Sequence, residues 1–487
     1  MTMPSTTQAS PVLPASALGQ IAAGAHRLGI STPRLIHVGL GALTAALLLF
    51  WGAGTSIVFE AKTGVQTIGH DTAPSIIAAQ QIRANLADLN ANAANAALTR
   101  GAAAAQAWSD YRNDQAALSD HLVSAAQNIT YGDAERKPIV AIATRVQAYD
   151  DLIGAARAIM AAADPLQTTA PEAALALVRQ AASIMNGELL PAADGLNDAN
   201  ETVLEQTWTN RKTAFLFDTL ALVGCGLPAV AILLVLQRLI AARTRRIVNP
   251  MMLAATGIMI AGALWAGYGL ESSANALTRA KQDAFDSVRA MWKSRSIAYS
   301  ANADESFFLL DRAGQPGYAR QFQAKLAQLT WPTFSQEKPR GLFLSAVRNF
   351  EANDCKGQHQ AFAGYFGDEL GNVTFPDECK AAAGIYATFA SYIAIDGRIR
   401  ELEATGQHDA AIALCVGTKP GESNHAFALF DKQIDRVIEI NQREFDDLIA
   451  RAADRLGPLP WIIGIASLLA GLLTMLGLRP ILSEYRA

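Results

Sequence analysis

The sequence lacks the motifs of the large enzyme classes. It has no His-Glu-x-x-His zinc motif, no Gly-x-Ser-x-Gly nucleophile motif and no glycine-rich phosphate loop followed by Lys-Ser or Lys-Thr. Its seven histidines are scattered, and no two of them lie within one helical turn. We therefore expect no catalytic residue, no cofactor and no metal ion, and the chain is not predicted to be an enzyme. The net charge of −4 gives no indication of nucleic-acid binding.

What the sequence does contain is four long apolar runs, each long enough to cross a bilayer as a helix, which takes about 20 residues. They cover residues 35–58, 214–236, 251–271 and 459–478. The segments 59–213 and 272–458 between them are long and polar, whereas the loop 237–250 is short. The sequence thus predicts an all-α membrane protein with four transmembrane helices and two exported helical-bundle domains, embedded in the lipid bilayer.

Positive charge next to short loops marks the cytoplasmic side of a membrane. The loop 237–250 carries Arg238, Arg243, Arg245 and Arg246 and no acid, and the flanking tails 1–34 and 479–487 are also basic. Both long segments contain more acidic than basic residues. We therefore predict a multi-pass protein of the plasma membrane with both termini and the loop in the cytoplasm. The tail 1–34, rich in Pro, Ser, Thr and Ala, is predicted to be disordered.

Each exported segment reads as a series of helices. In the first segment, Leu175, Ala182, Leu189, Leu196 and Val203 fall on one heptad row, which is typical of an antiparallel four-helix bundle. Its helices are expected at about 60–100, 104–130 and 135–163 and from Pro171 onward, with a kink at Pro191. In the second segment they are expected at about 272–311, 317–329, 340–353, 357–370, 376–405 and 421–456. Such bundles resemble the periplasmic sensor modules of bacterial chemoreceptors and sensor kinases.

Three cysteines lie in the second exported segment, where disulfides are permitted. No Cys-x-x-Cys pair occurs, so a zinc site is not expected. Cys355 and Cys415 each lie beside turn-forming residues, and we predict a disulfide between them. A Cys355–Cys379 bond is the second choice. The loop that follows Cys415, up to Phe427, is interpreted as a structural turn, with a partner-docking loop as the alternative.

Because no long segment is predicted inside the cell, any output has to be a change of helix position that another protein reads. The only cytoplasmic candidates are the C-terminal tail and a relay loop, which we hypothesise to consist of Arg243, Arg245, Arg246, Asn249 and Pro250. Asn249-Pro250 is expected to set the start of the third apolar helix. An alternative interpretation is that the arginines only determine the membrane topology and contact anionic lipid headgroups.

Several segments resemble the GlnX-like four-span membrane proteins of actinobacteria. They are RRIVNPMMLAATGIMIAGALW, ANADESFFLLDRAG, DGRIRELEATGQHDAAIALCVGTKPGESNHAFALFD, LGLRPILSEYRA and RQAASIMNGELLPAA. This resemblance implies two partners, an extracytoplasmic glutamine-type substrate-binding lipoprotein and a cytoplasmic serine/threonine protein kinase. It further implies that the chain relays a signal between them.

Other functions are open on the sequence alone. The chain could be an envelope scaffold, a transporter component or an exported enzyme. A transporter needs polar groups that face each other within the membrane, and only the acidic Asp218 and the backbone-breaking Pro228 hint at such a site. Small residues along the apolar runs suit packing within one chain, and they also suit a homodimer.

Overall fold

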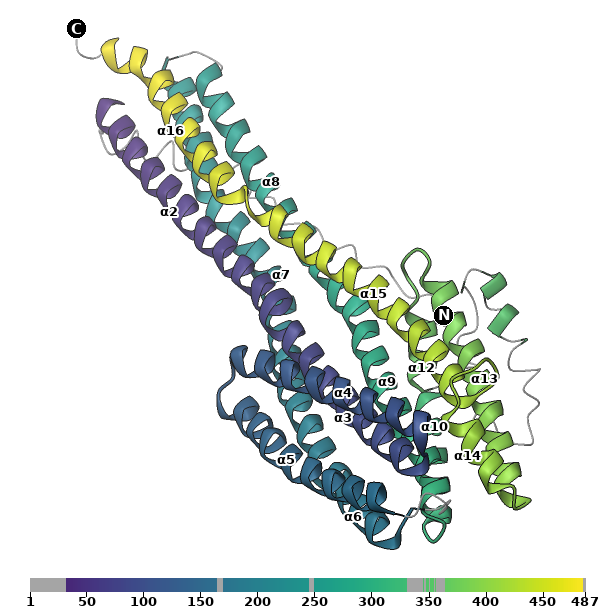
Figure 1. The fold of residues 1–487 in the computed structure, drawn as a ribbon. Coiled ribbons are helices and arrows are strands. Elements are labelled where there is room, and N and C mark those ends of the chain that lie inside the picture. Colours follow the sequence, from purple (N-terminus) through teal and green to yellow (C-terminus); the bar gives the residue numbers. More distant parts are fainter. Residues whose placement is uncertain are drawn as a thin grey trace, which may run out of the picture. The chain divides into compact units, whose positions relative to one another are not determined.

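The computed structural model describes residues 32–163, 170–244, 249–330, 345, 347–349, 351–353, 355 and 364–484. Within these ranges all regular structure is helical and no strand occurs (Figure 1). The all-α fold class predicted from the sequence is therefore confirmed for the described residues.

Among the described residues, four helical runs are long and apolar enough to cross a membrane: Pro33–Leu98, Glu172–Ala242, Pro250–Leu310 and Ser423–Ser483. Each contains one of the four apolar segments, which indicates a multi-pass membrane protein. The first three runs each contain a π-helical segment. Their elements are α2 (Thr32–Gln66), η1 (Thr67–Thr72), α3 (Ala73–Leu98), α6 (Glu172–Ile184), η2 (Met185–Leu189), α7 (Leu190–Thr244), α8 (Pro250–Arg279), η3 (Ala280–Phe285), α9 (Asp286–Leu310), α15 (Ser423–Leu456) and α16 (Leu459–Glu484).

The remaining helices agree with the predicted ones, with one addition. They are α4 (Gly101–Gln127), α5 (Asp133–Ala162), α10 (Gln315–Leu329), α12 (Tyr365–Asn372), α13 (Glu378–Ala404) and α14 (His408–Val416). The short helix α14 was not predicted. Half of the residues of the helix predicted at 340–353 are described, and of these 345, 347–349, 351 and 352 are helical.

The chain divides into two compact units, which we describe separately. The apolar unit contains residues up to 64, 211–275 and from 451 onward. Glycines on its helices allow close approach of neighbouring side chains. A Cβ atom at Gly39 would collide with Leu236, and one at Gly262 would come within 2.8 Å of Ala466. These contacts fit packing within one chain, whereas a Cβ at Gly224 would meet open space.

The polar unit contains residues 65–210 and 276–450 together. Helices α3 and α9 are buried over most of their surface, because helices of both segments pack around them. One hydrophobic core joins α3 to α7 with Phe307 of α9, and another joins α9 to α15 with Ile77 of α3. The two segments thus form one unit, and two separate bundle domains are not confirmed. The buried residues of α3 include many alanines, and those of α9 include serines and alanines. These small side chains allow the two helices to pack closely at the centre of the unit.

The predicted heptad row on α6 and α7 is buried at its first four positions. At the fifth position Val203 is partly exposed, and the neighbouring Leu204 is buried instead. The change lies between Leu196 and Leu204, after η2, and it fits the drift of about 20° per heptad that a straight α-helix shows against a strict seven-residue repeat. No break in the helix occurs at Pro191, which is the second residue of α7. The π-helical segment η2 ends directly before α7 begins.

Candidate functional site

Asn249, at the end of the predicted relay loop, lies where the helices α7, α8 and α16 are connected by hydrogen bonds. The Asn249 Oδ1 accepts hydrogen bonds from the backbone N–H groups of Met251 (3.1 Å) and Met252 (3.4 Å), so this side chain caps the N-terminus of α8. Its Nδ2 donates to the carbonyl of Gly477 on α16 (2.8 Å). Gln237 of α7 donates to the Met252 carbonyl at 2.9 Å. One asparagine and one glutamine therefore connect α7, α8 and α16 around a cavity of about 290 Å³.

Pro250 is the first residue of α8, as its missing N–H and fixed φ favour. The prediction that Asn249-Pro250 starts the third apolar helix is confirmed. The Arg243 side chain, Arg245 and Arg246 lie outside the described residues, so their proposed role stays a hypothesis.

The π-helical segments η1 and η3 occupy equivalent places in the two halves. Each is six residues long, follows an apolar helix directly and leads into a central helix of the polar unit. In η1, Thr72 Oγ1 bonds the Thr67 carbonyl (3.0 Å) and the Tyr131 hydroxyl (2.8 Å). In η3, the buried Lys281 pairs with Glu205 of α7 (2.8 Å). Single π turns recur at functional sites of helical proteins, and here they repeat with the architecture.

Ion pairs join the two segments of the polar unit. The Asp194 carboxylate of α7 forms ion pairs with Arg83 of α3 (2.7 Å) and with Lys293 of α9 (2.8 Å). Burial raises the pKa of Asp194, but the two cations outweigh it and leave the pKa below its usual value. Arg179 of α6 binds both carboxylate oxygens of Asp311 and lowers its pKa. These groups hold the first segment to the second.

A buried polar cluster lies where α9, α13, α14 and α15 meet. Glu305 is fully buried, and its Oε1 accepts a hydrogen bond from Ser423 Oγ (2.8 Å) at the start of α15. Its pKa is raised to about 7, first by burial and then by the nearby Asp396. The neighbouring Asp304 instead faces Lys325 (2.5 Å), so the two adjacent acids have different partners. The Ser423 contact agrees with a structural turn before α15.

A polar cavity of about 730 Å³ lies within the polar unit, between helices of both segments. We define it by six of its lining residues: Gln80, Asn197, Glu201, Asp286, Arg289 and Glu369. Nothing in the sequence marked these residues, because they come from α3, α7, α9 and α12. Their local patterns are those of ordinary polar helix faces.

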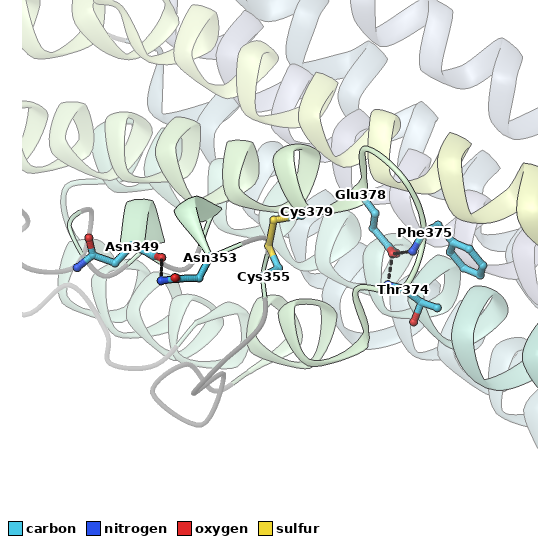
Figure 2. The surroundings of a disulfide bond; sticks show 7 residues. All are labelled: Asn349, Asn353, Cys355, Thr374, Phe375, Glu378 and Cys379. Atoms are coloured by element: carbon cyan, nitrogen blue, oxygen red, sulfur yellow. Dashed lines mark hydrogen bonds between the residues drawn. A yellow bond between two sulfur atoms is a disulfide. The ribbon is translucent and has the colours of Figure 1, made fainter.

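The disulfide predicted between Cys355 and Cys415 is wrong. Cys355 is bonded to Cys379, the second residue of α13, with Cα atoms 5.6 Å apart (Figure 2). This separation is in the usual disulfide range. Cys415 lies instead on the unpredicted helix α14, buried in a cluster with Leu309 and Ile399, with its Sγ 3.9 Å from Ser306 Oγ. The bond to Cys379 was the second choice.

The start of α13 is fixed next to the disulfide. Glu378 Oε2 accepts hydrogen bonds from the backbone N–H groups of Thr374 (2.6 Å) and Phe375 (2.9 Å) (Figure 2). Its Oε1 accepts one from Asn441 of α15 (2.6 Å). The Glu378 carboxylate therefore fixes the turn that precedes α13, since both backbone donors lie before the helix begins.

Comparison with known families gives one partial match. Residues 64–209 match a family described as the actinobacterial sensor domain. The match covers the part of the first segment that lies in the polar unit, from η1 to α7. Comparisons with curated proteins and with solved structures give no significant match. The matched part supports a sensor-type protein.

Proposed function

We propose that this chain is a membrane signal relay that couples an extracytoplasmic amino-acid-binding lipoprotein to a cytoplasmic serine/threonine protein kinase. In this proposal both termini and the loop 237–250 are cytoplasmic, and the segments 59–213 and 272–458 face outward. The chain itself performs no catalysis in this role. The lipoprotein, the amino acid and the kinase rest on the sequence resemblance to GlnX-like proteins.

The observation that carries the proposal is the sensor-domain match on helices continuous with the apolar runs. α7 alone is one uninterrupted helix of 55 residues that contains parts of both units. A packed helix moves as a rigid element, so a displacement at one end is felt at the other. Docking of the lipoprotein would shift such helices in the polar unit.

Asn249 provides a point at which such a shift could be read. It connects α8 to α16, and Gln237 connects α7 to α8, so movement of any of these helices disturbs the same junction. We expect Asn249→Ala to weaken kinase coupling while the protein still inserts into the membrane. Unchanged kinase phosphorylation in this variant would contradict a role for the junction.

The arginines of the loop are tested by a double substitution. Changing Arg245 and Arg246 to Gln should reduce co-purification of the kinase, whereas changing Arg27 and Arg34 to Gln removes two cytoplasmic charges outside the loop and should not. Equal co-purification from both variants, with insertion intact, would leave the loop as a topology signal only. A chain that co-purifies both partners without altering phosphorylation would be an envelope scaffold.

A further inference from the structure

Two loops of the polar unit repeat the same sequence pattern and the same hydrogen bonds. One begins at Asn128 and reads Asn-Ile-Thr-Tyr-Gly-Asp, and the other begins at Asn372 and reads Asn-Val-Thr-Phe-Pro-Asp. They lead into the long helices α5 and α13. In the first loop, Glu135 Oε2 accepts hydrogen bonds from the backbone N–H groups of the threonine (2.8 Å) and the tyrosine (2.7 Å). Glu378 Oε2 accepts the equivalent two bonds in the second loop (Figure 2).

Each loop also contacts the π turn of its own segment. The Tyr131 hydroxyl bonds Thr72 in η1 (2.8 Å). The Asn372 amide donates to the carbonyls of Gln282 (3.0 Å) and Asp283 (3.1 Å) in η3. A π turn interrupts the regular bonding of an α-helix, and backbone carbonyls need a donor. Loop and π turn therefore form one joint, and this joint occurs in both segments.

The correspondence continues along α5 and α13. A tyrosine follows each loop glutamate after 14 residues, at Tyr149 and Tyr392. The Tyr149 hydroxyl donates to Asn90 of α3 (3.2 Å). Burial raises the pKa of Tyr392, and a hydrogen bond with Asn302 of α9 opposes this rise. Each tyrosine thus meets an asparagine on the central helix of its own segment.

An arginine follows each tyrosine after eight residues, at Arg157 and Arg400. The Arg157 guanidinium lies over the ring of Trp108 (4.9 Å to the centroid), and that of Arg400 lies over the ring of Phe322 (4.7 Å). Both rings belong to the eighth residue of their helices, α4 and α10. Similar packing of unrelated helices does not require the same side-chain pairs at the same spacing.

The central helices α3 and α9 correspond in the same way. Arg83 and Arg295 each lie seven residues before the asparagine that meets the tyrosine. Arg83 pairs with Asp194 of α7 (2.7 Å), and Arg295 pairs with Asp431 of α15 (2.5 Å). Both partners lie on the last long helix of the segment.

Equivalent levels of α3 and α9 meet where the two helices touch. Ser306 Oγ donates to Asn95 Oδ1 (2.7 Å), and Arg83 donates to Ser296 Oγ. With Arg83 aligned to Arg295, each of these bonds joins positions that are one residue apart. Contact of each position with its own counterpart is the property of a two-fold interface between like units.

We propose that residues 272–458 contain a second copy of the sensor domain matched at 64–209, and that the two copies pair within one chain through α3 and α9. The copies differ most between α10 and α12, where the second has an insertion relative to α4. A signal received by either copy then reaches the shared centre. This proposal rests on the sensor-domain match and does not depend on the proposed lipoprotein or kinase.

Moving one hydrogen bond tests whether the two joints are equivalent. With the arginines of α3 and α9 aligned, Ala284 and Phe375 correspond to Thr72 and Tyr131. Ala284→Thr with Phe375→Tyr should raise the Tm of the purified full-length protein by about 2 °C beyond the sum of the single changes, as one added hydrogen bond does in a unit of this size. Thr72→Ala with Tyr131→Phe gives the reference coupling. Additive changes at 284 and 375, with coupling at 72 and 131, would overturn the proposal.

Hydrogen–deuterium exchange gives a second test that does not require new side chains to fit. Glu135→Gln should speed exchange of the first loop about tenfold or more, since charge-assisted bonds are lost, and Glu378→Gln should do the same for the second. Each change should also speed exchange in the π turn of its own copy, η1 or η3. Glu401→Gln, which alters a largely exposed carboxylate on α13, should affect neither. A π turn that stays as slow as in Glu401→Gln while its loop is exposed would contradict a shared joint.

Discussion

Asp194 offers a direct test of whether the two long segments fold as one unit. It lies on α7 and binds Arg83 of α3 and Lys293 of α9, which belong to different segments. Replacing Asp194 with Asn keeps the shape and removes the charge. Hydrogen bonds to charged groups contribute about 1.5–3 kcal/mol each when buried. The Asp194 side chain is 34% exposed, so we discount the two bonds to about 2 kcal/mol in total.

For a unit of this size that loss lowers the unfolding midpoint by about 4 °C. The measurement is thermal unfolding of the detergent-purified chain, followed by tryptophan fluorescence. Asp151→Asn is the matched control, because Asp151 is exposed on α5 and should cost less than about 0.5 kcal/mol.

A double-mutant cycle with Lys293→Met isolates the contact between the segments. We expect a coupling energy of about 1 kcal/mol between positions 194 and 293. Zero coupling, or the same midpoint for Asp194→Asn and Asp151→Asn, would refute the reasoning that these ion pairs hold the segments together.

Three further predictions concern the disulfide, pH and topology. Cys379→Ser should destabilise the polar unit by up to about 3 kcal/mol and shift its mobility on non-reducing gels, since the bond to Cys355 closes 24 residues of chain; unchanged mobility would contradict the pairing. The raised pKa of Glu305 means that the folded state binds this proton more tightly than the unfolded state, so stability should fall as pH rises from about 4.5 to about 7, and Glu305→Gln should flatten that dependence in thermal unfolding; an unchanged slope would exclude Glu305 as its source. A reporter active only outside the cell should work when fused at Gly132 and fail after Arg246, and the reverse pattern would overturn the orientation.

Local patterns explain which parts of the fold could be predicted. The apolar runs and the heptad row depend on residues close in sequence, so the long helices were predicted correctly, and the heptad row is buried at four of its five positions. Helix α14 was missed because it has nine residues, of which only Ala411 and Cys415 are buried. This is too short for a periodic pattern. The disulfide prediction failed for the same reason, because it relied on the turn-forming residues beside Cys415 and missed the helix that contains it.

Contacts between distant segments could not be predicted from such patterns. The alanines of α3 indicate a helix, but nothing in them shows that α9 will pack beside it. The polar cavity depends on that packing, since Gln80 and Glu369 both line it although they are far apart in the sequence. The asparagine at 249 was identified through its proline neighbour, whereas its bond to Gly477 depends on tertiary structure.

The central claim is that this chain passes a signal from an exported binding protein to a cytoplasmic kinase. The most direct test measures kinase phosphorylation in membranes that contain the full-length chain, with the binding lipoprotein added in its loaded and empty forms. The account predicts that phosphorylation changes with the loaded form and that Asn249→Ala suppresses this change. Phosphorylation that is equal with loaded protein, empty protein and no chain at all would contradict it.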